Sequence, residues 1–217
     1  MVNEIVIVDA ANPESQVLER AALLIAQGKV IVCPTDTGYA LAANALDPEA
    51  VTLIFNLKGR DYSNPIHVAV NSIEAAGKYA VISPAAERLA ASFLPGALTL
   101  VLLRREIVPA MLVAGLDTIG IRIPDNRVIL NLAKLTKLPL TATSANASGQ
   151  PAPYSITEII EQLGELAGGV ALFLDQGPLP TPQLSTIIDL TVDPPRLLRP
   201  GKISWPEIEN VLPLSPD

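Results

Sequence analysis

Lys58 and Arg60 are the residues whose types and spacing most clearly suggest chemistry. They bracket Gly59 in an irregular segment between a predicted helix and a predicted strand, so both side chains can point toward one anion. Arginine offers a planar fork of N–H donors that fits phosphate, while lysine offers a mobile point charge. The pair indicates an anion-binding site, and the alternative is a solvated surface loop.

Polar segments follow predicted strands at two further places. Thr35 and Thr37 flank a carboxylate directly after a buried strand, where they either bind a polar substrate or form a structural turn. Residues 143–149, which include Ser144 and Asn146, are small and polar, so their backbone N–H groups can approach a phosphate. They lack the Gly-Lys-Ser/Thr of a P-loop, and an ordinary turn is the alternative.

Two predicted strands carry arginines. Thr118 and Arg122 lie four positions apart on one strand, which places them on the same face. Because an arginine in so apolar a strand is costly to bury alone, Arg122 is expected to meet an anion. Ser185 begins another strand, and Arg199 lies near the end of the chain. These four residues add hydroxyls and cations to the candidate site.

The chain has one histidine, His67, and one cysteine, Cys33. These counts exclude an intramolecular disulfide, a thiolate zinc cluster and a multi-histidine metal site, so no residue is assigned to a metal. A lone histidine on an alternating strand is more often structural than a ligand, and both roles stay open for His67. Cys33 in its apolar strand is interpreted as a small buried hydrophobe.

Charge is scarce in this sequence. The 217 residues include only 17% charged residues and carry a net charge of −7, while 49% are hydrophobic. This composition excludes a disordered chain and argues against general affinity for nucleic acid, which requires lysine and arginine to neutralise phosphates. Residues 58–130 nevertheless carry a net +2. A site for a small anionic molecule is compatible with that distribution.

Strand and helix patterns alternate along the chain, without internal repeats or a clear domain boundary, which predicts one domain over residues 1–217. The predicted strands cover residues 4–9, 30–33, 38–45, 66–70, 98–103, 119–123, 138–143, 170–174, 185–190 and 196–199. The predicted helices cover residues 13–27, 48–57, 84–93, 109–113, 126–136, 155–166 and 206–211, with a short one after Ser72. A loop is predicted at 34–37 and a proline-rich loop at 177–182. The sequence shows no signal peptide or membrane span, and we expect a cytoplasmic protein.

Taken together and in this order, these segments resemble the YrdC/YciO family of threonylcarbamoyl-AMP synthases from about Val30 to Lys202. Each segment is a weak signal by itself, and eight of them in register are specific. The segments that carry the resemblance are 34–39, 58–60, 64–65, 95–99, 118–122, 144–149, 185–186 and 199–201.

The resemblance implies an α+β (α/β-like) fold, YrdC/RibB-like, with an open, twisted, mixed β-sheet flanked by helices around a basic cleft. It also implies a nucleotidyltransferase that makes L-threonylcarbamoyladenylate and pyrophosphate from ATP, bicarbonate and L-threonine. The product would serve the threonylcarbamoyladenosine modification of tRNA, together with partner proteins. Mg²⁺ is expected to accompany ATP.

The resemblance also implies roles for individual residues. Lys58 and Arg60 would be catalytic, facing the phosphates and the bicarbonate-derived carboxyl group from a partly exposed position in the cleft. The residues implied to contact ATP are Arg60, Asn64, Thr118, Ser144, Asn146 and Arg199. The residues implied to hold threonine are Thr35, Arg122 and Ser185.

A second interpretation is a YciO-type paralogue that binds double-stranded RNA, tRNA or a nucleotide without synthesis. Family members often carry a histidine where Ala69 stands and a serine where Ala152 stands. His67 shares a strand face with Ala69, so it is a candidate substitute for that histidine. The chain ends one short helix after Lys202, and the additional C-terminal domain of longer members is expected to be absent.

Overall fold

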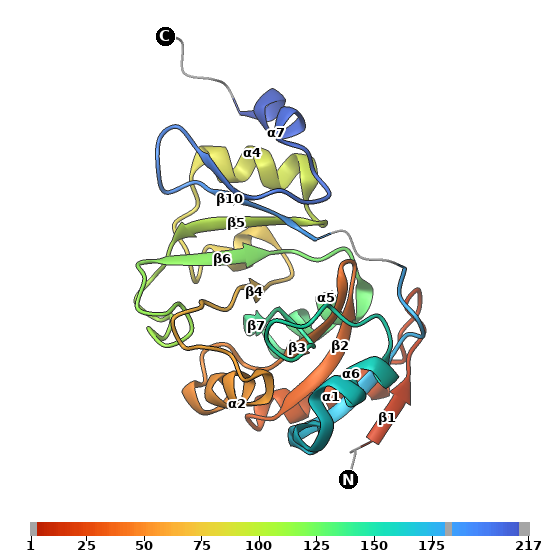
Figure 1. The fold of residues 1–217 in the computed structure, drawn as a ribbon. Helices are drawn as coiled ribbons and strands as arrows, with labels where there is room; N and C mark the ends of the chain where they lie inside the picture. Colours follow the sequence, from red (N-terminus) through yellow and green to blue (C-terminus); the bar gives the residue numbers. More distant parts are fainter. Residues whose placement is uncertain (1–3, 181–183, 213–217) are drawn as a thin grey trace.

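The computed structural model describes residues 4–180 and 184–212. Eleven strands are seen in this part of the chain, and they form two mixed sheets. The first sheet contains, in spatial order, β1 (Glu4–Ile7), β9 (Val170–Asp175), β2 (Val30–Thr35), β3 (Gly38–Ala42) and β8 (Thr143–Ser144). The second contains β11 (Arg196–Arg199), β10 (Thr186–Asp189), β5 (Leu98–Leu103), β6 (Thr118–Arg122), β4 (Val68–Ala69) and β7 (Leu140–Thr141). In Figure 1, β10, β5 and β6 of the second sheet lie above β2 and β3 of the first.

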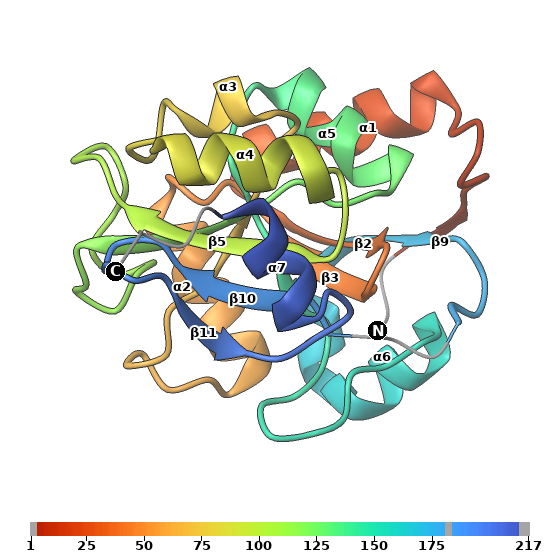
Figure 2. The same cartoon turned by 90° about the horizontal axis from the view of Figure 1, so that it is seen from above.

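Helices cover both sides of these sheets. They are α1 (Ser15–Ala26), α2 (Pro48–Lys58), α3 (Ile73–Ala76), α4 (Pro84–Phe93), α5 (Arg127–Thr136), α6 (Ile156–Leu163) and α7 (Trp205–Val211), with a 3₁₀ turn, η1 (Gly164–Gly169), after α6. Figure 2 shows α1, α3, α4 and α5 on one side and α2 and α6 on the opposite side. The predicted mixed fold flanked by helices is thus confirmed, with two sheets where the sequence predicted one. No helix of the described segments is both long and apolar enough to cross a membrane.

The two sheets meet where one predicted strand is divided. Residues 138–143 were expected to form a single strand, but β7 pairs with β4 of the second sheet, while β8 pairs with β3 of the first. Between them, the Ala142 N–H donates to the carbonyl of His67 at 2.9 Å. An isolated bridge between Asn44 and Leu140 adds a further link. We call this junction, formed by residues 140–144 with β3 and β4, the seam.

The hydroxyl of Thr141 stabilises the seam by hydrogen bonds to the backbone of the neighbouring segment. It donates to the Leu41 carbonyl at 3.0 Å and accepts from the Ala43 N–H at 3.0 Å, so that a β7 side chain bonds to the chain at the end of β3. The Thr141 N–H also donates to the Ala43 carbonyl at 3.0 Å. Thr141 is fully buried, which makes these bonds inaccessible to competing water.

Local signals explain most helix ends. The carboxylate of Asp47 caps α2 by accepting from Glu49 N at 2.9 Å, and Pro48 takes the first helical position, where its missing N–H costs nothing. Gly59 ends α2 in the left-handed region, at φ 57°. This turn directs the chain out of the helix at Arg60.

Several boundaries differ from the prediction. The first helix begins at Ser15 rather than after Asn12, because Glu14 is its N-cap. The predicted loop at 34–37 is a hairpin turn in which Thr35 and Gly38 are already paired. The segment 109–113, which was predicted to be helical, forms a series of turns. It is too short for a helix to propagate. The proline-rich loop at 177–182 lies partly outside the described residues.

We predict that Thr141→Val weakens the fold by about 1–3 kcal/mol, because a buried carbonyl and a buried N–H lose their shared partner. Urea unfolding followed by circular dichroism measures this free energy. Thr52→Val is the matched control, since the Thr52 hydroxyl bonds back to the Pro48 carbonyl within α2 and otherwise contacts only the Met111 sulfur near the surface, at 3.3 Å. Its effect should stay within about 0.5 kcal/mol. Equal stability of the two variants would show that the seam does not depend on this hydroxyl.

Candidate active site

A cavity of about 190 Å³ opens at the seam. Strands from both sheets and two loops contribute to its wall, so it gathers residues that are far apart in the sequence. The polar residues that line it are Thr35, Thr37, Arg60, His67, Thr99, Arg122, Thr143, Ser144, Ser185 and Arg199. The wall therefore contains six of the residues implicated from the sequence, namely Thr35, Arg60, Arg122, Ser144, Ser185 and Arg199.

Arg60 enters the cavity from the turn that ends α2. Its Nε donates to the Asn64 carbonyl at 3.1 Å, and its Nη2 donates to the Pro65 carbonyl at 3.0 Å. Burial lowers the pKa of the guanidinium. Both partners are neutral carbonyls, so the positive charge of Arg60 remains uncompensated and attracts an anion.

Arg199 lies on β11 and is held in a similar way. Its Nε and Nη2 donate to the Ser185 carbonyl at 3.1 and 2.8 Å, and Nη2 also donates to Ser185 Oγ at 2.9 Å. The Ser185 hydroxyl lies 3.0 Å from the Thr99 hydroxyl. Burial, and then the neighbouring Arg122, lower the pKa of Arg199. Ser185 thus fixes a second cation without neutralising it.

Arg122 has the anionic partner that its apolar strand predicted. Its Nη2 lies 2.6 Å from a carboxylate oxygen of Asp36, Nε donates to the Gly96 carbonyl at 3.3 Å, and Nη1 donates to the Thr37 hydroxyl. The Thr35 hydroxyl donates to the Gly38 carbonyl at 2.7 Å and accepts from Thr37 N at 3.1 Å, which fixes the hairpin turn. Burial lowers the pKa of Arg122 more than Asp36 raises it.

Lys58 lies behind the cavity wall rather than in the cavity. We expected a partly exposed side chain, and this was wrong, because only 3% of Lys58 is exposed. Its Nζ donates to the Asn146 carbonyl at 2.8 Å, to Asn146 Oδ1 at 2.9 Å and to the Ser144 carbonyl. Lys58 therefore holds the loop at 144–146 from the inside. Burial and, to a smaller extent, Arg60 lower the pKa of its ammonium group to about 7.

Asn146 completes this support. Its amide donates to the carbonyls of Ala147 at 3.0 Å and Gln150 at 2.6 Å, while its Oδ1 accepts from Lys58 and from the Ser144 hydroxyl. Ser144 itself is exposed and lines the cavity. The loop thus presents Ser144 to the cavity and uses Asn146 as its internal brace.

Two other implicated residues do not line the cavity. The side chain of Asn64 is exposed, and Asn64 contributes to the site only through its backbone carbonyl, which accepts from Arg60 Nε. Thr118 is the first residue of β6 and pairs with Leu103, whereas Arg122 is the last residue of the strand and pairs with Thr99. The shared strand face was predicted correctly, but the length of the strand separates the two side chains.

His67, for which the sequence left both a structural and a ligand role open, lines the cavity. Its ring packs against Gly120, where an added β-carbon would lie only 2.4 Å from His67 Cδ2. Burial lowers the pKa of His67 to about 4, and Arg199, Arg60 and Arg122 act in the same direction. The imidazole is therefore neutral at pH 7. Thr37, Thr99 and Thr143 also line the cavity. Thr37 and Thr143 lie in segments that the sequence singled out as candidate binding segments, although neither was assigned a ligand. Thr99 was assigned no role, and its signal was a hydroxyl within an otherwise aliphatic strand.

No cluster of three or more histidine, cysteine or acidic side chains that could hold a metal ion occurs in the described parts of the chain. The cavity instead offers guanidinium groups, hydroxyls and a neutral imidazole. Such a set binds phosphates and carboxylates and stabilises charge that develops on them.

We predict that acid destabilises the protein through His67. The unfolded histidine binds a proton near pH 6.5, but the folded one does so only near pH 4, so stability falls as the pH drops between these values. His67→Gln removes this contribution, and the difference between wild type and variant should change by about 2 to 3 kcal/mol over that range. Urea unfolding at successive pH values measures it. A constant difference would contradict a buried neutral imidazole.

Comparisons with known proteins agree with this architecture. The curated threonylcarbamoyl-AMP synthase of Pyrococcus abyssi is 43% identical over 193 residues, which cover 88% of this chain and 56% of that protein. A crystal structure of P. abyssi Sua5 complexed with L-threonine matches with a TM-score of 0.90 at 41% identity, covering 97% of this chain and 61% of that one. E. coli YciO matches with a TM-score of 0.85 at 26% identity, covering 97% and 100%.

The chain thus spans less than two-thirds of the length of its P. abyssi relative. A family model for Sua5, YciO and YrdC, described as "Telomere recombination", matches residues 23–201. Because this match covers most of the sequence, the chain belongs to the Sua5/YciO/YrdC family.

Proposed function

We propose that this chain forms L-threonylcarbamoyladenylate and pyrophosphate from ATP, bicarbonate and L-threonine, in the cytoplasm, for tRNA modification by partner proteins. The observation that carries the proposal is the convergence of Arg60, Arg122 and Arg199 on one cavity with the hydroxyls of Thr35, Ser144 and Ser185. The similarity to the P. abyssi synthase, and to the Sua5 structure solved with L-threonine, supports it.

The reaction brings several anions together. The amine of threonine joins the carbon of bicarbonate with loss of water, giving a carbamate. A carbamate oxygen then bonds to the α-phosphorus of ATP, and the bond to the bridging oxygen breaks to release pyrophosphate. Charge develops on phosphate oxygens in this second step, so fixed cations lower its barrier.

The residues of the cavity divide between these tasks. In this proposal Arg60 and Arg199 bind the phosphates. The Ser144 hydroxyl, whose proton is donated to Asn146 Oδ1, accepts a hydrogen bond from the nucleotide on the exposed side of its loop. Arg122, with Thr35 and Ser185, would hold threonine. Mg²⁺ would enter as part of the ATP substrate, held by its phosphates.

Four residues contribute indirectly in this proposal. Lys58 and Asn146 set the shape of the 144–146 loop, so they position Ser144 rather than touch the substrate. The carbonyl of Asn64 orients Arg60. Neutral His67 lines the same cavity as the three arginines without adding a fourth positive charge, while Thr118 lies at the far end of β6.

Purified protein incubated with ATP, L-threonine and labelled bicarbonate tests the proposal. We expect pyrophosphate release that depends on threonine, together with a labelled acyl-adenylate. ATP binding or RNA binding without threonine-dependent turnover would instead support the YciO-type interpretation. The sequence similarity favours the synthase, since the identity to the P. abyssi synthase is 43% but that to YciO is 26%.

We predict that Arg60→Ala and Lys58→Met both abolish most synthesis for different reasons. Arg60→Ala should lower kcat/KM about 100-fold or more, because one cation near the developing charge is lost. Lys58→Met should lower activity by loosening the loop that the ammonium group holds. The backbone amides of that loop, residues 144–149, would exchange with solvent about tenfold faster. Hydrogen-exchange mass spectrometry separates the two effects. Unchanged exchange in Lys58→Met would refute the positioning role and return Lys58 to direct contact.

A further inference from the structure

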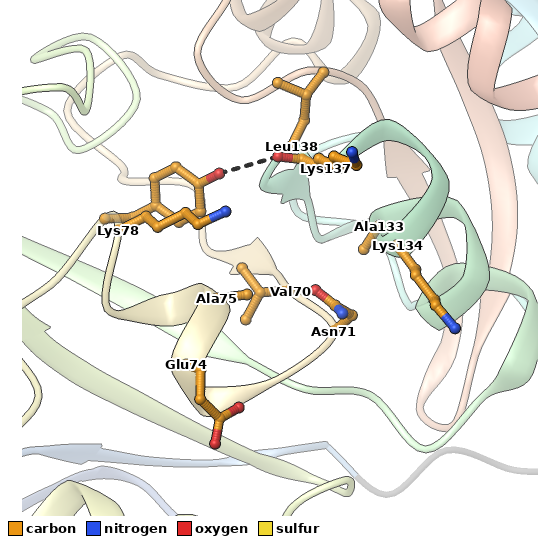
Figure 3. Close-up of a pocket in the computed structure, with 10 residues that line it drawn as sticks. Val70, Asn71, Glu74, Ala75, Lys78, Ala133, Lys134, Lys137 and Leu138 are labelled. Atoms are coloured by element: carbon orange, nitrogen blue, oxygen red, sulfur yellow. Dashed lines mark hydrogen bonds between the residues drawn. The ribbon is translucent and has the colours of Figure 1, made fainter.

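A second hollow, of about 260 Å³, lies between α3 and α5. It shares no lining residue with the cavity at the seam. Figure 3 shows the residues that line it, and Figure 2 shows that α3 and α5 lie on one outer side of the sheets. It therefore needs an explanation that is separate from the proposed synthase chemistry.

Three of the six lysines of the chain line this hollow. Lys78 follows α3, Lys134 lies in the last turn of α5, and Lys137 is the C-cap of that helix. All three are exposed, and none forms an ion pair in the described parts of the chain. The whole protein carries a net charge of −7, whereas these unpaired lysines give the hollow a local positive charge.

The acidic residue at the rim does not cancel this charge. The carboxylate of Glu74 bonds to the side chain of Ser72, the residue that caps α3. Figure 3 shows Glu74 directed away from the lysines. The hollow thus keeps the positive charge of Lys78, Lys134 and Lys137.

The floor of the hollow is apolar and tied together. Val70 and Ala133 are buried beneath it. The Tyr79 hydroxyl donates a long hydrogen bond of 3.4 Å to the Lys137 carbonyl, which links the segment that carries Lys78 to the end of α5 (Figure 3). Apolar floor, cationic rim and the amide of Asn71 together resemble the lining of a small-ligand site.

Lys137 also has an unfavourable backbone. Its φ is 57°, in the left-handed region where glycine ordinarily ends a helix. A lysine here is strained relative to glycine. Favourable interaction of its ammonium group with the helix C-terminus offsets part of this strain, and a ligand that uses the ammonium group would account for the rest.

We propose that this hollow binds a small phosphorylated ligand of nucleotide size, with its phosphate among the three lysines and its apolar part on the floor. An extended nucleic acid fits less well, because the surrounding helices carry acidic residues such as Glu19 and Glu87 rather than a continuing basic stripe. Arg105, whose Nε donates to the Gly77 carbonyl at 2.7 Å, adds one positive charge beside Lys78 but does not line the hollow.

AMP is the probe for this site. Titration of the isotope-labelled protein, followed by NMR, should shift the amides of residues 70–79 and 133–138, separately from any shifts around the seam cavity. Lys78→Gln/Lys134→Gln should weaken the AMP affinity that the shifts of residues 70–79 and 133–138 report by about tenfold. Lys29→Gln/Arg88→Gln removes two exposed positive charges that lie outside both sites and should leave binding unchanged. Adenosine, which lacks the phosphate, should produce little shift.

Lys137→Gly separates binding from folding. This variant relieves the left-handed strain but removes the ammonium group, so we expect weaker AMP binding with a Tm no lower than that of the parent. The proposal is overturned if AMP shifts only amides at the seam, or if Lys78→Gln/Lys134→Gln binds like its control. A short RNA duplex that shifts the same amides at lower concentration than AMP would also overturn it, in favour of a nucleic-acid surface.

Discussion

The structure of the site depends on one backbone constraint, the bend at Ala142. A strand that pairs with β4 through residues 140–141 must leave the second sheet to pair with β3 through residues 143–144. Two sheets that share a bent strand cannot remain coplanar, so a hollow opens beside the bend. The same bend delivers Ser144 and its loop to that hollow. Arg199 comes from the edge strand β11, Arg122 from the inner strand β6 and Arg60 from the turn after α2.

Two of the three cavity arginines, Arg60 and Arg199, and Lys58 behind the cavity wall are held by groups that do not neutralise them, whereas Arg122 is paired with Asp36. Carbonyl oxygens orient Arg60 and Lys58, and a carbonyl with a hydroxyl orients Arg199. Burying such charges without carboxylates is unfavourable, and the lowered pKa values of these groups express that cost. A bound polyanion would offset it. The uncompensated charge of the free protein is of the kind that an anion-binding site needs.

What could be predicted from the sequence was mainly local. The cap at Asp47, the proline after it and Gly59 fix α2, and its end at Arg60, without help from the rest of the chain. The apolar strand around Arg122 correctly predicted an anionic partner. By contrast, nothing local divides residues 140–144, since Leu-Thr-Ala-Thr-Ser has the pattern of one continuous strand, and only pairing with two distant partners bends it. The burial of Lys58 was hidden for the same reason, because its acceptors lie some 86 to 88 positions away.

The pairing of Arg122 with Asp36 bears on how an amino acid would be recognised. A guanidinium has five N–H donors, and the contacts with Gly96, Thr37 and Asp36 engage one on each nitrogen. One N–H on each terminal nitrogen is left for the carboxylate of a ligand, which could then bind without displacing Asp36. Since Asp36 and Thr37 form the hairpin turn that Thr35 fixes, the turn would set the position of that carboxylate. A carboxylate bound here would therefore be held by a rigid hairpin, with Arg122 supplying the charge and the turn supplying the geometry.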